Sequence, residues 1–453
     1  MNVTNLINKN VVDRKSAIDS YLKNRRHTQM LFDLLQPETY YDKPIPLRHP
    51  IVFYEGHIPA FSVNCFLRKG LGQAGINHDL EILFARGIDP SDFQEANRAA
   101  IKTWPERTTV QQYAREADQV ILEMLASATL EDDAKPALCR GQSVFTMLEH
   151  EIMHQETLLY MWHRLSPDQK KKPANMEPPR NESAPKPTTV HIPAGKTTLG
   201  SQLDEIPFGW DNEFPEFVID EVPAFEIDVY NVTNQDFLDF IEAGGYLNSS
   251  LWSQAGWRRL QATQRLHPMF WERISNRWMW RGMFGLTPLP HSWPVYVTHD
   301  EAAAYAQWKG QRLPTEAEFH RAAYGTPNGT EQLHPWGEAE PSRIHGNFDF
   351  RNWDPVSVGS YPAGASAWGV HDLVGNGWEW TSTVFNGFPG FQTMASYPEY
   401  SSDFFDDDHY VVKGASQATG RELIRRSFRN WFRPDYPYMY ASFRCTSDAE
   451  STQ

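Results

Sequence analysis

The most informative segment in the first part of the chain is His150-Glu151-Ile152-Met153-His154-Gln155-Glu156. It lies in a run of apolar residues at helical spacing, and neither Gly nor Pro occurs in residues 144–165, which favours one continuous helix. Each helical residue turns its side chain by about 100°, so His154 lies about 40° from His150, one turn along the same face. Two imidazoles at this spacing are a common way for a helix to hold a metal ion. We therefore predict a metal-binding helix inside Leu148–Leu165.

Two ligands do not complete a metal site, and the string allows other interpretations. It matches the His-Glu-x-x-His pattern of zinc hydrolases, in which Glu151 would be the general base. In a third interpretation, the two histidines bind no metal and are ordinary core or surface residues. Glu156 lies about 240° round the helix from His150 and is poorly placed for the same metal. His57, in the apolar stretch Ile51–Phe61, is either a core histidine with hydrogen-bond partners or a third ligand.

The composition bounds the class of protein. The chain has 453 residues, 40% of them hydrophobic, and 16 Trp, enough for two or three domains with sizeable cores. A net charge of −15 argues against nucleic acid as a partner. Three cysteines without CxxC spacing suit a reducing compartment. We see neither a signal peptide nor an apolar run long enough for a membrane span, and expect a cytoplasmic protein.

The pattern of residues changes once along the chain. Helical periodicity at 12–36, at 108–130 and in the metal helix predicts an N-terminal bundle of about four main helices over residues 1–165. Residues 166–188 hold six prolines and are expected to be a linker. Residues 189–453 combine dense Trp, Gly and Pro with short strand-like pieces, among them 190–200, 225–234 and 294–298. Short helices are expected at 235–242, at 300–309 and after Thr315, which forms a capping box with Glu318.

Four stretches of the second part are specific: Gly310-Gln-Arg-Leu-Pro-Thr-Glu-Ala-Glu-Phe319, Gly375-Asn-Gly-Trp-Glu-Trp-Thr381, Val411-Val-Lys-Gly-Ala-Ser416 and Ser442-Phe-Arg-Cys445. They resemble the formylglycine-generating-enzyme (sulfatase-modifying factor) fold, a variant of the C-type-lectin-like fold. The first part resembles the DinB-like four-helix bundle through its His-x3-His-x-Glu motif. A bundle, a linker and a lectin-like domain in this order resemble the non-heme iron sulfoxide synthases of the ergothioneine (EgtB) family. The resemblance implies an α+β chain.

The resemblance also implies a reaction and a metal centre. Members use Fe(II) and O2 to join the sulfur of cysteine, or of a cysteine-containing donor, to the imidazole of hercynine, which gives a sulfoxide. Ergothioneine biosynthesis is the implied pathway. His57, His150 and His154 match the three-histidine iron site of the family, which leaves open positions for O2 and a thiolate. The implied partners are these small molecules, with neither nucleic acid nor a membrane.

Further site residues follow from the same resemblance. Asn430 and Trp431 match the segment that helps to bind the trimethylammonium histidine, whose cation favours an aromatic face such as that of Trp431 or Trp378. A tyrosine commonly supplies a proton or an electron in this family. The candidate tyrosines are Tyr397, Tyr400, Tyr436 and Tyr438. We expect the active site to form between the two domains.

Two departures from the family pattern bear on the substrate. Phe432 stands where some members carry an Asp that contacts a γ-glutamylcysteine donor, and an apolar ring cannot satisfy the α-ammonium of that donor. Met153 replaces a Gln that contacts the histidine-derived substrate in other members. We therefore expect free cysteine, rather than γ-glutamylcysteine, to be the preferred thiol.

Other functions stay open at this point. They are an ovothiol- or selenoneine-type paralogue that forms a C–S or C–Se bond, an inactive binding module, and a zinc hydrolase. Formylglycine generation is not expected, because the second part lacks a recognisable catalytic cysteine pair. Cys445 belongs to the common Phe-Arg-Cys ending, and Cys65 lies in the other domain.

Overall fold

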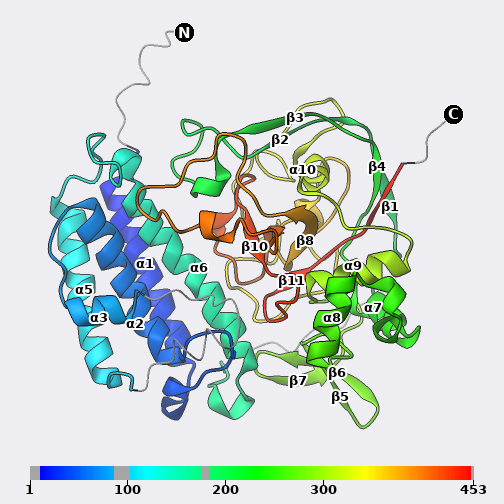
Figure 1. Cartoon of the computed structure of the whole chain (residues 1–453), viewed down its shortest axis with the longest axis horizontal. Helices are drawn as coiled ribbons and strands as arrows, with labels where there is room; N and C mark the ends of the chain where they lie inside the picture. The colour runs from blue at the N-terminus through cyan, green and yellow to red at the C-terminus, as the bar shows by residue number, and fades with distance from the viewer. Residues whose placement is uncertain (1–10, 86–102, 175–182, 450–453) are drawn as a thin grey trace. The chain divides into compact units, whose positions relative to one another are not determined.

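A computed structural model of the chain describes residues 11–85, 103–174 and 183–449. The chain divides into two compact units (Figure 1). The first consists of Met1–Ala174 together with Leu203–Trp210 and Thr393–Tyr400, and the second of Asn175–Gln202, Asp211–Gln392 and Ser401–Gln453. The first unit is helical and the second carries the sheets, which confirms the expected α+β class.

Among the described residues, four long helices and one short helix build the first unit. Their bounds are α1 Arg14–Asp33, α2 Ile51–Ser62, α3 His78–Leu83, α5 Arg107–Ser127 and α6 Gln142–Arg164. α1 packs against α5 and α6, and α2 packs against the same two helices, so that α1, α2, α5 and α6 form the predicted bundle (Figure 1). The core between them includes Tyr21, Phe66, Ile121, Leu125 and Met147.

The helix α2 was not evident from the sequence, because it contains Gly56 and Pro59, two residues that disfavour a helix interior. Gly56 is required by packing. A Cβ added there would lie 2.3 Å from Cζ of Phe84, a distance that no side chain tolerates. After Ser62 the chain continues as a π-helix over Val63–Gly70.

The expected linker is described only in part, since residues 175–182 lie outside the described residues. Its first part is ordered against the bundle. Pro167–Gln169 forms a 3-10 turn closed by Ser166, and Lys170 pairs with Leu35 in an isolated bridge. The buried Lys170 ammonium donates to the carbonyl of Trp162 at 2.8 Å.

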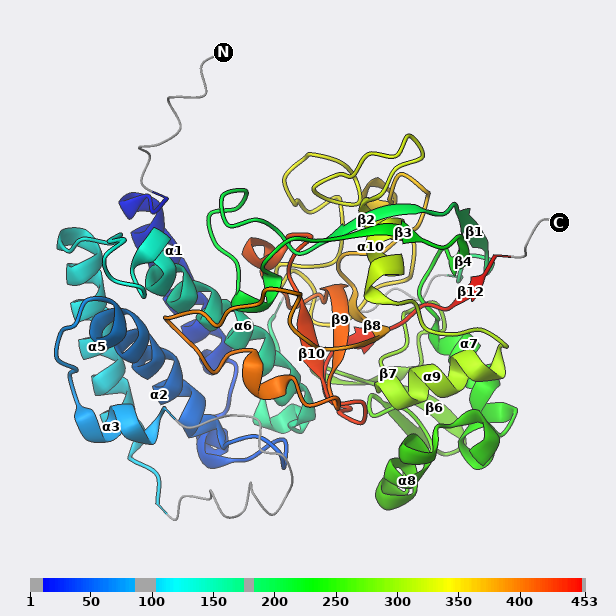
Figure 2. The same cartoon turned by 45° about the horizontal axis from the view of Figure 1, so that its top comes forward.

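Twelve strands of the described residues form four small sheets in the second unit (Figure 2). The bounds are β1 Thr189–Ile192, β2 Gly195–Leu199, β3 Phe217–Val222, β4 Phe225–Asp228, β5 Trp271–Ile274, β6 Arg277–Gly282, β7 Gly285–Pro288, β8 Gly377–Val384, β9 Tyr410–Ala415, β10 Asn430–Phe432, β11 Ala441–Ser442 and β12 Thr446–Asp448. The sheet orders are β1-β4-β12, β10-β9-β8-β11, β2-β3 and β5-β6-β7. Only the β8–β11 pair is parallel among them.

Short capped helices complete the second unit. They are α7 Asn234–Glu242, α8 Gln254–Thr263, α9 His299–Trp308 and α10 Glu316–Tyr324. The predicted capping box of α10 is confirmed, because the Thr315 side chain accepts from the Glu318 amide while Glu318 accepts from the Thr315 amide. Each such cap satisfies amides that the first helical turn leaves unpaired.

The strand expected at 294–298 is wrong. Val295 donates to the Val232 carbonyl and Val297 donates to the Ala441 carbonyl, so the segment bonds to two different partners and forms no ladder beyond the isolated bridge of Pro294 with Thr233. Across the described parts of the chain, no helix has the length and apolarity needed to cross a membrane.

Candidate metal centre

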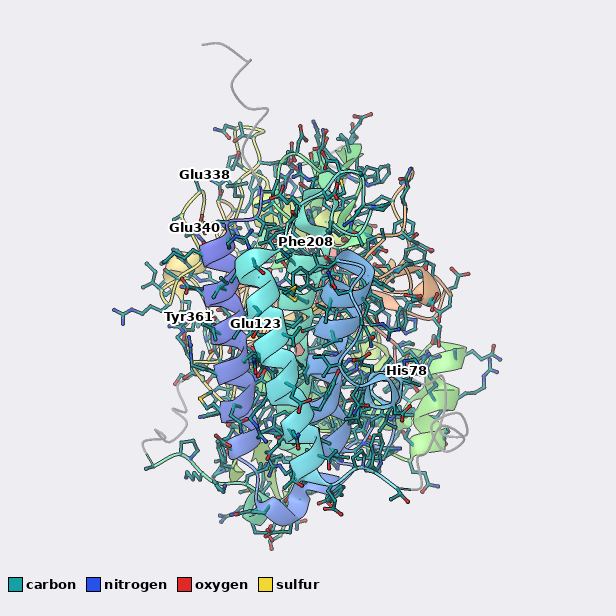
Figure 3. The ribbon with its side chains drawn as sticks, turned by 90° about the vertical axis from the view of Figure 1, so that its left-hand side faces the viewer. His78, Glu123, Phe208, Glu338, Glu340 and Tyr361 are labelled. Carbon is teal, nitrogen blue, oxygen red and sulfur yellow. The ribbon has the colours of Figure 1, made fainter. Side chains whose placement is uncertain are left out.

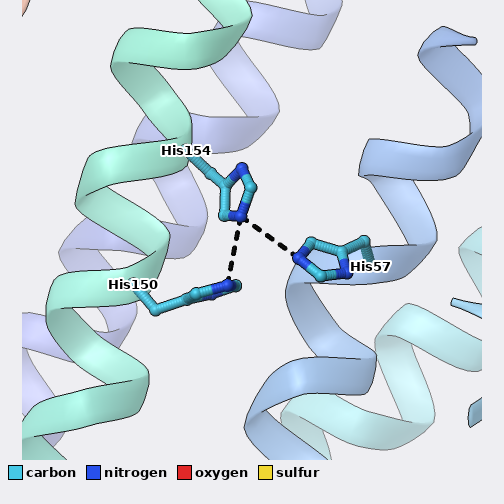
Figure 4. Close-up of side chains that lie close together, drawn as sticks. All are labelled: His57, His150 and His154. Atoms are coloured by element: carbon cyan, nitrogen blue, oxygen red, sulfur yellow. Dashed lines mark hydrogen bonds between the residues drawn. The ribbon is translucent and has the colours of Figure 1, made fainter. Parts of the chain in front are cut away.

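Three histidines meet inside the bundle. His57 comes from α2, and His150 and His154 come from adjacent turns of α6 (Figure 4). The Nε2 atoms of His57 and His154 are 3.1 Å apart, as are those of His154 and His150. Two nitrogens bound to one ion at about 2.1 Å, at angles from about 90° to 109°, lie roughly 3.0–3.4 Å apart. Both of these distances fit a shared metal ion, and the ligand atoms of all three histidines lie within 4.8 Å of one another.

Burial keeps these imidazoles neutral. Each histidine is at most 6% exposed. Burial lowers the pKa of His57 to about 4. Burial and then the neighbouring histidines lower the pKa of His150 and of His154 well below the ordinary value. A neutral imidazole offers a lone pair to a metal, so the cluster can hold a metal ion, and it is the one group of this kind among the described residues.

The orientation of His57 is fixed from behind. Its Nδ1 lies 2.7 Å from the carbonyl oxygen of Phe84 and donates to it, which leaves the lone pair on Nε2 directed at the other two rings. Phe53, one turn earlier on α2, stacks on the His57 ring at 4.9 Å. The hydrogen bond to the Phe84 carbonyl requires Phe84 to lie close to α2, and the absence of a side chain at Gly56 permits this approach.

A loop from the second half of the chain belongs to the same compact unit as the bundle. Residues 393–400 are attached through Ser396, whose hydroxyl lies 2.8 Å from that of Thr146 and whose amide donates to the Gln142 side chain at 2.9 Å. The loop carries the candidate Tyr397, whose ring centroid is 6.5 Å from that of His150. Phe61 lies against both rings, at 3.4 Å from His150 and 5.2 Å from Tyr397.

The second candidate tyrosine of this loop has a different environment. The hydroxyl of Tyr400 donates to Sδ of Met153 at 3.4 Å, and its ring stacks on Trp210 at 3.9 Å. Trp210 ends the segment Leu203–Trp210, which also lies in the first unit. In the same segment, Phe208, which is labelled in Figure 3, stacks on Phe145 of α6 at 5.6 Å.

The two glutamates of the helix motif lie outside the histidine cluster. Glu151, 1% exposed, accepts hydrogen bonds from Arg25 at 2.9 Å and from Thr28 at 2.6 Å. Both partners belong to α1, so Glu151 joins two helices of the bundle. Burial raises the pKa of Glu151, while Arg25 and Thr28 oppose the shift. This placement does not match a general base beside a metal.

The remaining sequence-predicted residues lie in the second unit. Asn430, Trp431 and Phe432 form β10, paired with β9. Trp431 stacks on Phe385 at 4.0 Å, and Asn430 Oδ1 accepts from the Trp431 amide at 2.9 Å. Trp378 in β8 is only 2% exposed, and its ring stacks on that of Phe428 at 5.9 Å.

Two further candidate tyrosines stand beside Phe432. The ring of Tyr436 stacks on Phe432 at 5.3 Å, and Tyr438 meets Tyr436 edge-on at 5.4 Å. The two thiols considered for formylglycine chemistry are buried. Burial raises the pKa of Cys65 to about 12 and that of Cys445 well above the ordinary value, which leaves both as unreactive thiols.

Sequence reasoning missed several residues around the centre. Phe61 was visible only as an aromatic residue four positions after His57. The signal for Phe84 was absent, because its carbonyl reaches His57 through tertiary packing. The ionic contact of Arg25 with Glu151 spans 126 positions and has no local signature.

Comparisons with known proteins agree with this architecture. The family of the sulfatase-modifying factor enzyme 1-like domain matches residues 174–449, and the DinB superfamily matches residues 20–158. Hercynine oxygenase of Mycolicibacterium smegmatis is 32% identical over 451 residues, which cover 97% of this chain and 100% of that protein.

Other relatives align over part of their length. Hercynine oxygenase of Mycobacterium tuberculosis is 41% identical over 253 residues, or 55% of this chain and 58% of the relative. Ergothioneine biosynthesis protein 1 of Neurospora crassa is 29% identical and aligns with 92% of this chain and 56% of its own length. The family resemblance seen in the sequence is confirmed, and this chain belongs to the hercynine oxygenase family, with a sulfatase-modifying factor enzyme 1-like domain after a region of the DinB superfamily.

Proposed function

We propose that this protein is an Fe(II)- and O2-dependent sulfoxide synthase that joins the sulfur of cysteine, or of a cysteine derivative, to the imidazole of hercynine in ergothioneine biosynthesis. The observation that carries the proposal is the buried cluster of His57, His150 and His154, in a chain that aligns over 97% of its length with a hercynine oxygenase. We place the reaction in the cytoplasm, with hercynine, the thiol and O2 as its partners.

Three histidine nitrogens are suitable ligands for an iron ion that reacts with O2. Three neutral imidazoles leave coordination positions for other ligands, which Fe(II) uses in non-heme oxygenases. When bound, Fe(II) supplies the site at which O2 and a thiolate react. The three Nε2 atoms of the chain would hold the ion, and the Phe84 carbonyl keeps the His57 proton on Nδ1, away from it.

The alternative of a zinc hydrolase has little structural support. It requires Glu151 to accept a proton from a metal-bound water, and Glu151 is instead occupied by Arg25 and Thr28 on α1. Formylglycine generation requires reactive cysteines, and Cys65 and Cys445 are fully buried thiols. Neither function is favoured by a specific observation.

We assign different tasks to the two loop tyrosines. Tyr397, beside the His150 ring, is the one that holds and delivers a proton at its hydroxyl during C–S bond formation. Tyr400 is a positioning residue, because its hydroxyl contacts the Met153 thioether and its ring lies on Trp210. Through these contacts it fixes Met153 next to the ligand His154.

Selection of the substrates is assigned to both units. In the second unit, Asn430 and the face of Trp431 bind hercynine. Trp378 is the less favoured aromatic face, because it is almost fully buried. The apolar Phe432, stacked on Tyr436, offers no charge to the α-ammonium of γ-glutamylcysteine, and free cysteine is the preferred donor. In the first unit, we assign a contact with hercynine to the thioether of Met153, which directly precedes His154 in the sequence.

Anaerobic loading with Fe(II), and separately with Zn(II), tests the proposal. The Fe(II) protein should consume O2 only when hercynine and cysteine are both present, and the Zn(II) protein should consume none. Tyr397→Phe should lower kcat by about 100-fold or more, as expected for loss of a proton-transfer group, whereas Tyr400→Phe keeps the ring on Trp210 and should lower it less than about 10-fold. Equal kcat losses in the two variants would overturn the assignment, and O2 consumption without hercynine would overturn the proposed reaction.

A further inference from the structure

Phe61 covers one face of the imidazole of His150. The two ring centroids are 3.4 Å apart and the ring planes are inclined by only 8°, the closest and most parallel stack around the three histidines. Phe61 lies in the last turn of α2, four residues after His57. The same helix therefore supplies one member of the cluster and the ring that lies on another.

His150 lacks the anchor that His57 has. His57 donates from Nδ1 to the Phe84 carbonyl, the usual arrangement by which a metal-binding imidazole is held in one orientation. Nδ1 of His150, like that of His154, is buried and has no hydrogen-bond partner among the described residues. A ring without such a bond turns about its χ2 bond unless packing stops it, and the Phe61 ring is the packing that does so.

The stacking geometry itself points to a metal-bound imidazole. Two electron-rich rings avoid an overlapping parallel arrangement and favour an offset or edge-on one. An imidazole that donates its lone pair to a cation becomes electron-poor, and its attraction to the negative face of a phenyl ring then increases. The contact between Phe61 and His150 should therefore be stronger with the metal bound than without it.

We propose that Phe61 is a positioning residue that fixes the plane of His150 for metal binding and couples it to Tyr397, whose ring it meets at 5.2 Å and 65°. This inference rests on the proposed metal site and not on which thiol is used. Phe61 contacts neither substrate in the proposal. Its effect acts through His150 and Tyr397.

The test measures metal binding rather than turnover. Cobalt(II) is titrated into the full-length metal-free protein, and its visible ligand-field spectrum gives both Kd and the symmetry of the site. Phe61→Leu removes the aromatic face, and Phe61→Tyr keeps it. Phe145→Leu is the matched control. Phe145 is also a partly buried phenylalanine of the bundle that stacks on a ring, that of Phe208, and among the described residues it has no ring contact with the three histidines.

We expect Phe61→Leu to raise the Kd for Co(II) by about 10- to 100-fold, the usual effect of losing a group that orients a metal ligand, and to change the spectrum. Phe61→Tyr should restore both within about threefold, and Phe145→Leu should match the wild type. Kd and spectrum unchanged in Phe61→Leu, or Phe61→Tyr as weak as Phe61→Leu, would overturn the inference. Failure of the wild-type protein to bind Co(II) would instead overturn the proposed metal site.

Discussion

Replacing Glu151 by Gln separates the two chemistries that the helix motif allows. The substitution keeps the shape of the side chain and removes its charge. In the structure the Glu151 carboxylate accepts hydrogen bonds from Arg25 at 2.9 Å and from Thr28 at 2.6 Å, inside the bundle. Arg25 keeps a second partner, Asp118, at 2.8 Å. No guanidinium is left unpaired, and Gln keeps the one oxygen that accepts both hydrogen bonds. The two bonds are therefore weakened rather than lost, at a total cost of about one hydrogen bond to a charged group.

The expected loss of stability follows from these hydrogen bonds. A hydrogen bond to a charged group contributes about 1.5–3 kcal/mol, less than the 3–5 kcal/mol or so lost when a buried ion pair leaves one charge alone. Glu151→Gln should therefore lower the free energy of unfolding of the first unit by about 2 kcal/mol, measured from its transition in urea. Its metal content should be unchanged.

Turnover then decides between the chemistries. With hercynine and cysteine, Glu151→Gln should keep kcat within about twofold of the wild type, because the carboxylate faces α1. A hydrolytic general base at this position would instead lose about 10²- to 10⁴-fold. Thr28→Val is the control, since it removes the other donor to the same carboxylate and should cost about 1.5–3 kcal/mol without changing kcat. A kcat that falls more than 100-fold in Glu151→Gln but not in Thr28→Val, with full iron content, would contradict the structural role of Glu151.

Three further predictions address the ligands, the donor and a buried charge. His57→Ala, His150→Ala and His154→Ala should each lose bound iron, measured by elemental analysis, and unchanged iron in all three would contradict the site. Cysteine should have a larger kcat/KM than γ-glutamylcysteine, and Phe432→Asp should move that ratio towards γ-glutamylcysteine; a wild-type preference for γ-glutamylcysteine would rule this out. Burial lowers the pKa of Lys413 from 10.5 to about 8, so between these values the unfolded chain binds a proton that the folded chain does not. The free energy of unfolding should therefore rise with pH in this range, by about 2 kcal/mol from about pH 7.5 to about 9.5 relative to that of the Lys413→Met variant. A difference between the urea midpoints of wild type and variant that does not change with pH would contradict the lowered pKa of Lys413.

Local chemistry predicted the parts of the fold that depend on nearby residues. The i, i+4 histidines of α6 share a face because helical periodicity requires it, and the Thr315 cap of α10 formed because Glu318 stands three positions later. The start of α6 at Gln142, six residues before the expected helix, was harder to see. Its preceding turn is set by the left-handed backbone of Gly141, at φ 68°.

Long-range packing set the features that local reasoning missed. The helix α2 survives Gly56 because Phe84 occupies the space of the absent side chain. The same contact brings a carbonyl to His57, so the third histidine reaches the cluster through a tertiary arrangement. Tyr397 joins the first unit across more than 200 positions, held by Ser396 on Thr146 at 2.8 Å. Periodicity carries no information about such a pairing.

The most direct test of the proposed reaction is the mass of the product formed from hercynine and cysteine under ¹⁸O2. The reaction joins one carbon and one sulfur, places one oxygen on sulfur and releases the other as water. We predict a single Fe(II)-dependent product whose mass equals hercynine plus cysteine plus one oxygen less two hydrogens, with the oxygen labelled. We expect no product from His57→Ala. Oxidation of the thiol alone, with hercynine recovered unchanged by the iron-loaded wild type, would contradict it.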